Sequence, residues 1–159
     1  MLDVQREERG ATSEGIAGVE RYLHDHIPLS KAMQIRVVEA GQERVRLSAP
    51  LAPNINHQST AFGGSVSAVA ILSAWTLLHL RLRDFTDPQR IVIQRNSMEY
   101  LLPIETDISA TCAAPLDAEW KRFFDLLRRR GRARIDLSAD VYAGEELAGR
   151  FEGSYVVLR

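Results

Sequence analysis

Residues 63–80 read GGSVSAVAILSAWTLLHL, and this stretch contains no Lys, Arg, Asp or Glu. An uncharged run of this length could cross a lipid bilayer. Three Ser, one Thr and one His dilute its apolar character, and no second run of this kind accompanies it. A helix that is apolar on every side is also what the centre of a soluble domain requires. We therefore predict that residues 63–80 form the central helix of a soluble domain, with no membrane span.

A polar loop leads directly into this helix. Residues 51–65, LAPNINHQSTAFGGS, hold two Asn, one His, two Ser, one Thr and a Gly pair. The first four N–H groups of a helix lack partners inside the helix, and a capping side chain meets part of that need. The surplus of hydrogen-bonding groups indicates a ligand site at the start of the helix.

Short runs with strand periodicity lie on both sides of the central helix. Residues 133–142, ARIDLSADVY, alternate apolar and polar side chains, as in an antiparallel strand with one buried face. Residues 117–130 have helical spacing and end at Gly131, a typical residue after a helix. The other predicted elements are a helix over 13–26 stopped by Pro28, a hairpin over 33–40 and 43–50, and strands over 91–101, 107–114 and 147–159. Six mostly antiparallel strands round one apolar helix make an α+β domain over 13–159, preceded by a flexible N-terminal arm over 1–12.

The composition argues against several classes of function. The chain of 159 residues has 20 Lys and Arg against 21 Asp and Glu, so its net charge of −1 provides no overall field for nucleic acid or an anionic membrane. Cys112 is the only cysteine and the N-terminus has no secretory segment, which together favour the cytoplasm. His24 and His26 point to different sides of their helix, so we expect no metal site there.

Three motifs together resemble one known family. They are PNINHQSTAFGGS at 53–65, HDHIPLSKAM at 24–33 and YLLPI at 100–104. Over about residues 15–158 the chain resembles the stand-alone form of the hotdog-fold thioesterase family named after the C-terminal domain of YiiD. The resemblance implies a single hotdog domain, with a six-stranded antiparallel sheet wrapped round a long apolar central helix and a second short helix. Members are described as acyl-thioester enzymes, and some as malonyl-ACP decarboxylases that supply acetyl-ACP for fatty-acid initiation.

The resemblance also implies partners. The substrate would be an acyl group carried on CoA or on the phosphopantetheine arm of an acyl carrier protein (ACP), with no further cofactor. Hotdog sites generally form between two protomers, so a homodimer or a dimer of dimers is implied, and Tyr100 would complete the pocket of the other protomer.

One departure from the wider hotdog pattern bears on the reaction. In other hotdog thioesterases the loop reads N-x-x-G-T-x-H-G-G, and an acidic residue follows about two turns into the helix. The matching positions here are Asn56, Thr60, Gly63 and Gly64, and the substituted ones are Ser59 and Phe62. The acidic position falls on Ile71, and residues 51–83 contain no Asp or Glu. This departure favours decarboxylation of a malonyl thioester, which needs no base, over thioester hydrolysis; a non-catalytic acyl-CoA binding module is a further alternative.

The candidate site combines helix-start N–H groups with polar loop side chains. These N–H groups are fixed donors for a thioester oxygen, and Gly lacks the Cβ that would hold the oxygen away. Amide, hydroxyl and imidazole groups can donate to a malonyl carboxylate, and His57 is the one candidate base in the loop. We expect catalytic roles for Asn56, Asn54, His57, Thr60, Gly63 and Gly64, and substrate-binding roles for Ser59, Phe62, Ser65, Tyr100, Arg128, Arg129 and Arg130.

Some of these residues also have ordinary structural interpretations. Either loop Asn could form a turn, and Ser65 could bond back to a helix carbonyl. The segment KRFFDLLRRRGRAR at 121–134 has seven basic residues and one acid. It could be a solvated helix end whose cations suit the helix dipole, or a docking patch for the acidic surface of ACP or for CoA phosphates.

Overall fold

The computed structural model describes residues 13–159, so the arm predicted over 1–12 lies outside the described residues. The predicted helices and strands occur in the predicted order. Their bounds are α1 Ser13–His26, α2 Pro28–Ala32, β1 Arg36–Ala40, β2 Arg44–Ala49, the 3₁₀ helix η1 Ala52–Asn54, α3 Gly63–Arg81, β3 Arg90–Tyr100, β4 Ile108–Ala113, α4 Asp117–Arg130, β5 Arg132–Ala143 and β6 Glu146–Leu158.

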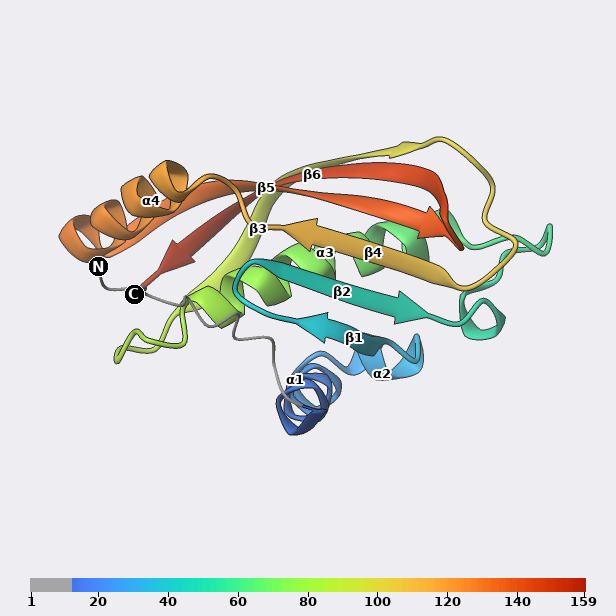
Figure 1. Cartoon of the computed structure of the whole chain (residues 1–159), viewed down its shortest axis with the longest axis horizontal. Coiled ribbons are helices and arrows are strands. Elements are labelled where there is room, and N and C mark those ends of the chain that lie inside the picture. The colour runs from blue at the N-terminus through green and yellow to red at the C-terminus, as the bar shows by residue number, and fades with distance from the viewer. Residues whose placement is uncertain (1–12) are drawn as a thin grey trace, which may run out of the picture.

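The six strands form one antiparallel sheet in the order β1-β2-β4-β5-β6-β3, which curves round α3 (Figure 1). Along β5 the odd-numbered residues from Ala133 to Val141 are buried and the even-numbered ones are exposed. Because successive side chains of a strand point to opposite faces, one face of the sheet packs on the core and the other meets solvent. The predicted sheet and its alternation are confirmed.

Helix α3 is the central helix that residues 63–80 predicted. It is the one described helix long and apolar enough to cross a membrane by length and composition, and half of its apolar window is buried inside the protein. Ser73 and Thr76 donate to helix carbonyls at 2.8 and 2.7 Å, which satisfies two hydroxyls in an apolar setting. The hydroxyl of Tyr155 on β6 donates to the carbonyl of Ile71 at 2.7 Å, so the sheet is tied to the middle of the helix.

The buried groups near this contact do not ionise readily. Burial raises the pKa of the Tyr155 hydroxyl, and it raises the pKa of the Cys112 thiol on β4 to about 12. Cys112 therefore behaves as a small core residue.

Two short elements were missed. Pro28 does not only stop the first helix, because it also begins α2, where a missing N–H costs nothing. The 3₁₀ helix η1 lies inside the polar loop and was read as irregular chain.

Helix α4 packs at the end of the core where α3 finishes (Figure 1). The guanidinium of Arg81 lies 4.8 Å from the centre of the Trp120 ring, and the rings of Phe85 and Phe124 stack at 5.5 Å. Gly131 ends α4 with a φ of 65°, the left-handed conformation that Gly adopts without strain. The C-terminal end of α3 is therefore closed by aromatic packing.

Candidate functional site at the start of α3

The N-terminus of α3 has no side-chain cap. Phe62 occupies the cap position with φ −62° and ψ 130°, and its own N–H donates to the carbonyl of Asn54 at 2.7 Å. The first hydrogen bond of the helix runs from Val66 N–H to the carbonyl of Phe62 at 3.1 Å. Among the described residues, the N–H groups of Gly63, Gly64 and Ser65 have no acceptor. Three donors at the positive end of a helix dipole are thus left for a ligand.

The polar loop before α3 closes on itself. Its Oδ1 of Asn56 accepts from the N–H groups of Gln58 at 2.9 Å and Thr60 at 3.1 Å. Its Nδ2 donates to Thr60 Oγ1 at 2.8 Å, and a backbone bridge joins Ile55 to Ala61. This geometry is that of an Asx-type turn, so it supports the turn-forming interpretation of Asn56. A catalytic role for Asn56 or Thr60 stays a prediction.

Asn54 lies beneath the loop and is 2% exposed. Its Nδ2 donates to the carbonyls of Met33 at 2.9 Å and Pro50 at 2.8 Å. Its Oδ1 is buried and has no partner in the described part of the chain. Asn54 therefore joins the α2–β1 corner to the end of β2, and through its carbonyl it positions Phe62 at the start of α3.

Ser59 stands where related loops carry Gly, and its φ is 63°. A residue with a Cβ is strained in this left-handed region, whereas Gly is not. The loop thus keeps the backbone shape that the motif requires although the Gly is replaced. His57 and Ser59 are both exposed at the tip of the loop.

The end of β3 lies beside the helix start. The Tyr100 hydroxyl donates to the carbonyl of Gly63 at 3.0 Å, and a Cβ on Gly63 would lie 3.5 Å from that hydroxyl. The exposed ring of Phe62 covers Gly64, where a Cβ would lie 2.4 Å from a ring carbon. Tyr100 therefore contacts the helix start of its own chain, and whether it also reaches another protomer stays a prediction.

Carboxylates reach the loop from another segment. The segment after β3 runs along the loop, because the N–H of Ala61 donates to the carbonyl of Ile104 at 2.7 Å. Glu105 follows directly, and Asp107 accepts from the N–H of Leu51 at 3.2 Å. Reasoning restricted to residues 51–83 missed both acids. The only sequence signal for them was the motif YLLPI, which ends where this pairing occurs.

The other predicted residues are not all near this site. Ser65 is half-buried in the first turn, and Ile71 is partly buried in the middle of α3. Arg128, Arg129 and Arg130 lie at the opposite end, because α4 packs where α3 finishes. The 19 residues of α3 span about 28 Å at 1.5 Å per residue. Within one chain these arginines therefore do not meet the N–H groups of Gly63 and Gly64.

The two histidines of α1 have local backbone partners. A ring nitrogen of His24 lies 2.8 Å from the carbonyl of Ile35, and one of His26 lies 2.9 Å from that of Tyr22. Over the described residues no group of three or more His, Cys, Asp or Glu could hold a metal ion.

Comparison with known proteins adds a common description. Residues 16–159 match the family described as "Putative thioesterase (yiiD_Cterm)". A solved structure from Chlorobaculum tepidum, of unknown function, is 31% identical with a TM-score of 0.84 over 90% of this chain and 93% of that one. One from Shewanella oneidensis, which carries the same thioesterase description, is 26% identical with a TM-score of 0.82 over 93% and 100%. A thioesterase from Haemophilus influenzae is 13% identical with a TM-score of 0.71 over 96% and 94%, and shows the shared fold alone. The predicted hotdog fold is confirmed.

Proposed function

The chain belongs to the thioesterase family of the YiiD C-terminal domain, and from this premise we propose that it is an enzyme that decarboxylates malonyl-ACP to acetyl-ACP. One observation carries the proposal: three N–H groups at the start of α3 have no acceptor among the described residues. They are placed to bind the carbonyl oxygen of an acyl thioester and to stabilise the negative charge that develops there.

The reaction needs an oxyanion site more than it needs a base. The bond between the carboxylate carbon and the methylene carbon of the malonyl group breaks, and CO2 leaves. The electron pair of that bond passes into a thioester enolate, whose oxygen receives the N–H groups of Gly63 and Gly64. A proton from water then adds to the methylene carbon and gives the acetyl thioester. Residues 51–83 carry no acid, so no carboxylate of the loop or helix repels that of the substrate.

Hydrolysis is the second candidate, favoured by the carboxylates of the segment after β3. Glu105 is exposed, and it follows the residue that pairs with Ala61. A carboxylate near a bound thioester could activate water as a general base.

The product formed by the wild-type protein decides between the two reactions. With malonyl-ACP we expect acetyl-ACP and CO2, resolved by mass. Free malonate and holo-ACP would contradict the proposal and return the protein to the hydrolases. Intact malonyl-ACP, together with binding of a panel of acyl-CoAs, would indicate a non-catalytic binding module.

The proposal includes a homodimer. β3 is an edge strand of 11 residues paired only with β6 among the described strands, so one side of its backbone is free. Val92 and Ile93 on it are 48% and 36% exposed. A long edge strand with exposed apolar residues is suited to pairing with another strand.

A further inference from the structure

Six arginines gather at the end of the molecule where α4 finishes and β3 begins. This arginine cluster consists of Arg90, Arg128, Arg129, Arg130, Arg132 and Arg159. Backbone pairing places its members together, because Leu158 is paired with both Arg90 and Arg132, and the N–H of Arg159 donates to the carbonyl of Gly131 at 2.8 Å.

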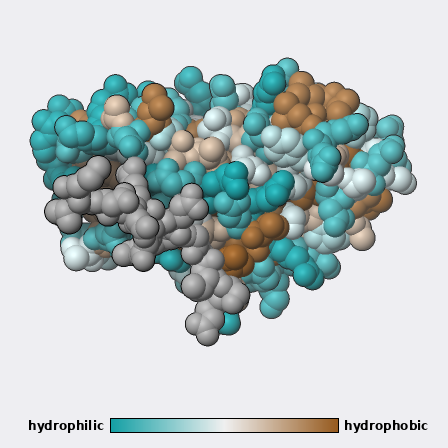
Figure 2. Space-filling model, in the orientation of Figure 1, coloured by the Kyte–Doolittle hydropathy of each residue, from teal (hydrophilic) through white to brown (hydrophobic). Residues whose placement is uncertain are grey.

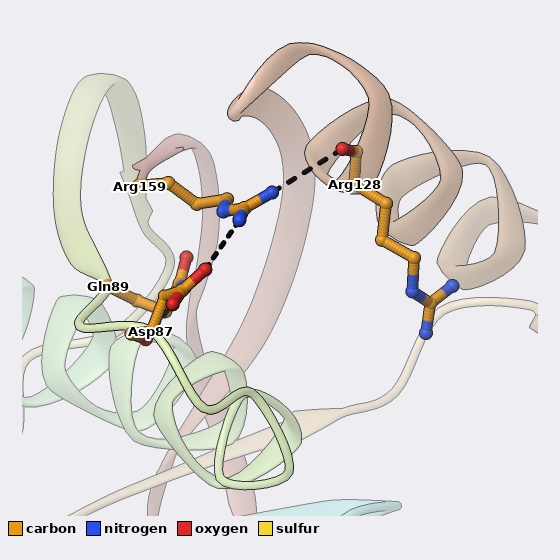
Figure 3. A network of polar contacts seen from close by, with 4 residues as sticks. All are labelled: Asp87, Gln89, Arg128 and Arg159. Atoms are coloured by element: carbon orange, nitrogen blue, oxygen red, sulfur yellow. Dashed lines mark hydrogen bonds and ion pairs between the residues drawn. The ribbon is translucent and has the colours of Figure 1, made fainter.

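Half of the cluster has no acidic partner. Arg159 bridges Asp87 and the carbonyl of Arg128, while the Arg128 side chain points away from both (Figure 3). Arg128 lies over the Phe85 ring and 3.9 Å from Asp125. In the described part of the chain, Arg90, Arg130 and Arg132 make no ion pair and are exposed. Exposed, unpaired cations on a protruding surface suit the acidic face of a protein, which they attract over several ångströms.

Strand β3 connects this cluster to the site at the start of α3. It begins at Arg90, inside the cluster, and ends at Tyr100, whose hydroxyl contacts Gly63. Figure 2 shows hydrophobic residues gathered over the far end of β3, where the exposed Leu101 and Leu102 follow. The 11 residues of the strand span about 35 Å. In one chain, the cluster and the site therefore lie at opposite ends of β3.

Antiparallel pairing of β3 with β3 of a second copy would remove this separation. Directly opposed side chains of paired strands share a face, so the register must match faces. Ile91 and Ile93 face α3 because they oppose the buried Val157 and Tyr155, and Met98 opposes the buried Phe151. After the bulge between Ile93 and Arg95, Tyr100 shares this face with Met98. Pairing Ile91 with the second copy's Tyr100, and Ile93 with its Met98, satisfies the rule with apolar pairs throughout.

We infer that the arginine cluster of each copy serves the site of the other, by docking an acidic acyl carrier protein whose acyl arm enters at Gly63 across the dimer. The inference rests on the proposed function. Two copies related by the β3 pairing bring the start of one β3 beside the end of the other. Arg90 and its neighbours of one copy then lie next to Tyr100 and the open N–H groups of the other.

A cross-link tests the geometry without any activity. The double variant Ile91→Cys/Tyr100→Cys should form a covalent dimer on mild oxidation, seen on a non-reducing gel. Each single variant should not, since Ile91 opposes Tyr100 and not itself. The native Cys112 is buried and does not compete. A double variant that stays monomeric on the gel would overturn the inference whatever the reaction proves to be.

Mixed dimers test the docking. One copy carries Gly63→Pro with its cluster intact, and the other carries Arg130→Glu/Arg132→Glu with its site intact; two affinity tags isolate the mixed dimer. The readout is KM for malonyl-ACP divided by KM for malonyl-pantetheine. We expect this ratio to rise at least tenfold in the Arg130→Glu/Arg132→Glu homodimer. In the mixed dimer it should return to the wild-type value, because its one live site is served by the intact cluster. Arg36→Glu/Arg46→Glu, a matched reversal of two exposed arginines on β1 and β2, should leave the ratio unchanged.

Each other outcome has a distinct meaning. A ratio that stays high in the mixed dimer would show that the cluster acts on its own chain and would overturn the inference. An equal rise of KM for malonyl-CoA would assign the cluster to nucleotide phosphates and overturn the carrier protein. If the wild type leaves malonyl-pantetheine intact, the proposed function fails, and the cross-link still decides the geometry.

Discussion

The two ends of α3 are built in opposite ways. At its C-terminal end, Arg81 lies on Trp120 and Phe85 stacks on Phe124. The N–H of Leu82, just after the helix, points at the carbonyls of Leu78 at 3.1 Å and His79 at 3.3 Å. At its N-terminal end the helix starts with two glycines and no side-chain cap. One end satisfies its polar groups and buries its rings, and the other leaves donors open.

The contrast is informative because the means to cap α3 are present nearby. Asn56 and Thr60 are residue types that cap helices well, yet their side chains bond to each other and to the loop. A cap commonly contributes about 1 kcal/mol. The protein forgoes this stabilisation at one end of the helix, which is the general trade between stability and an open site. The closed end should therefore carry stability and the open end activity.

The largest effect is expected at the open end. Gly63→Pro removes one unpaired N–H, and Pro suits the first position of a helix after an extended residue such as Phe62. We expect kcat on malonyl-ACP to fall about 100- to 1000-fold, the effect of losing an oxyanion donor, with the unfolding free energy nearly unchanged. Gly63→Ala keeps the N–H, and its Cβ fits 3.5 Å from Tyr100, so it should stay active. Equal activity of the Pro and Ala variants would remove this N–H from the mechanism.

The closed end should respond in the opposite manner. Phe123 on α4 is 2% exposed and packs edge-on against Trp120 at 5.9 Å. Phe123→Ala should lower the unfolding free energy by about 3 kcal/mol, measured by urea denaturation, because it opens a cavity. The kcat of the folded variant should stay within twofold of the wild type. Phe123→Leu, which keeps most of the volume, should cost about 1 kcal/mol. A fall in kcat with Phe123→Ala at full folding would break the division between the two ends.

Asn56 tests whether the loop is scaffold or catalyst. Asn56→Ala removes the acceptor for two N–H groups, so it should destabilise the fold by about 1–2 kcal/mol. Asn56→Asp keeps that acceptor and loses only the donor to Thr60. If Asn56 is a turn former, the Asp variant should retain kcat within about fivefold on malonyl-ACP. A loss of 100-fold or more in the folded Asp variant would restore the amide of Asn56 to the substrate.

The smallest effect is expected at Ser59. Because its φ is 63°, Ser59→Gly relieves strain of about 1 kcal/mol, and the added freedom of Gly in the unfolded chain offsets part of it. We expect a net gain of about 0.5 kcal/mol in urea unfolding, with Ser59→Ala as the matched control that gains nothing. A destabilised Gly variant would show that the Ser side chain contributes more to the loop than its backbone strain costs.

Local patterns predicted the fold better than the site. The apolar run at 63–80 and the alternation at 133–142 were sufficient for a sheet around a central helix, because burial of that helix leaves few arrangements. Pro28 was ambiguous, since Pro both ends one helix and begins the next. The pairing of Asn56 with Thr60 consumes the groups that seemed available to a ligand, and the position of α4 moves Arg128 away from Gly63 in one chain. Both depend on contacts that no linear motif contains.

The buried thiol of Cys112 makes the protein its own reporter of sheet opening. Cys112 sits in β4 opposite Val45 and Ala139, so both neighbouring strands cover it. With a pKa of about 12, only about one thiol in ten thousand is ionised at pH 8, and no reagent reaches it in the closed sheet. Alkylation must then wait for a transient opening that frees β4. The ratio of the labelling rate to that of a free cysteine gives the free energy of this opening directly, with no denaturant and no added probe.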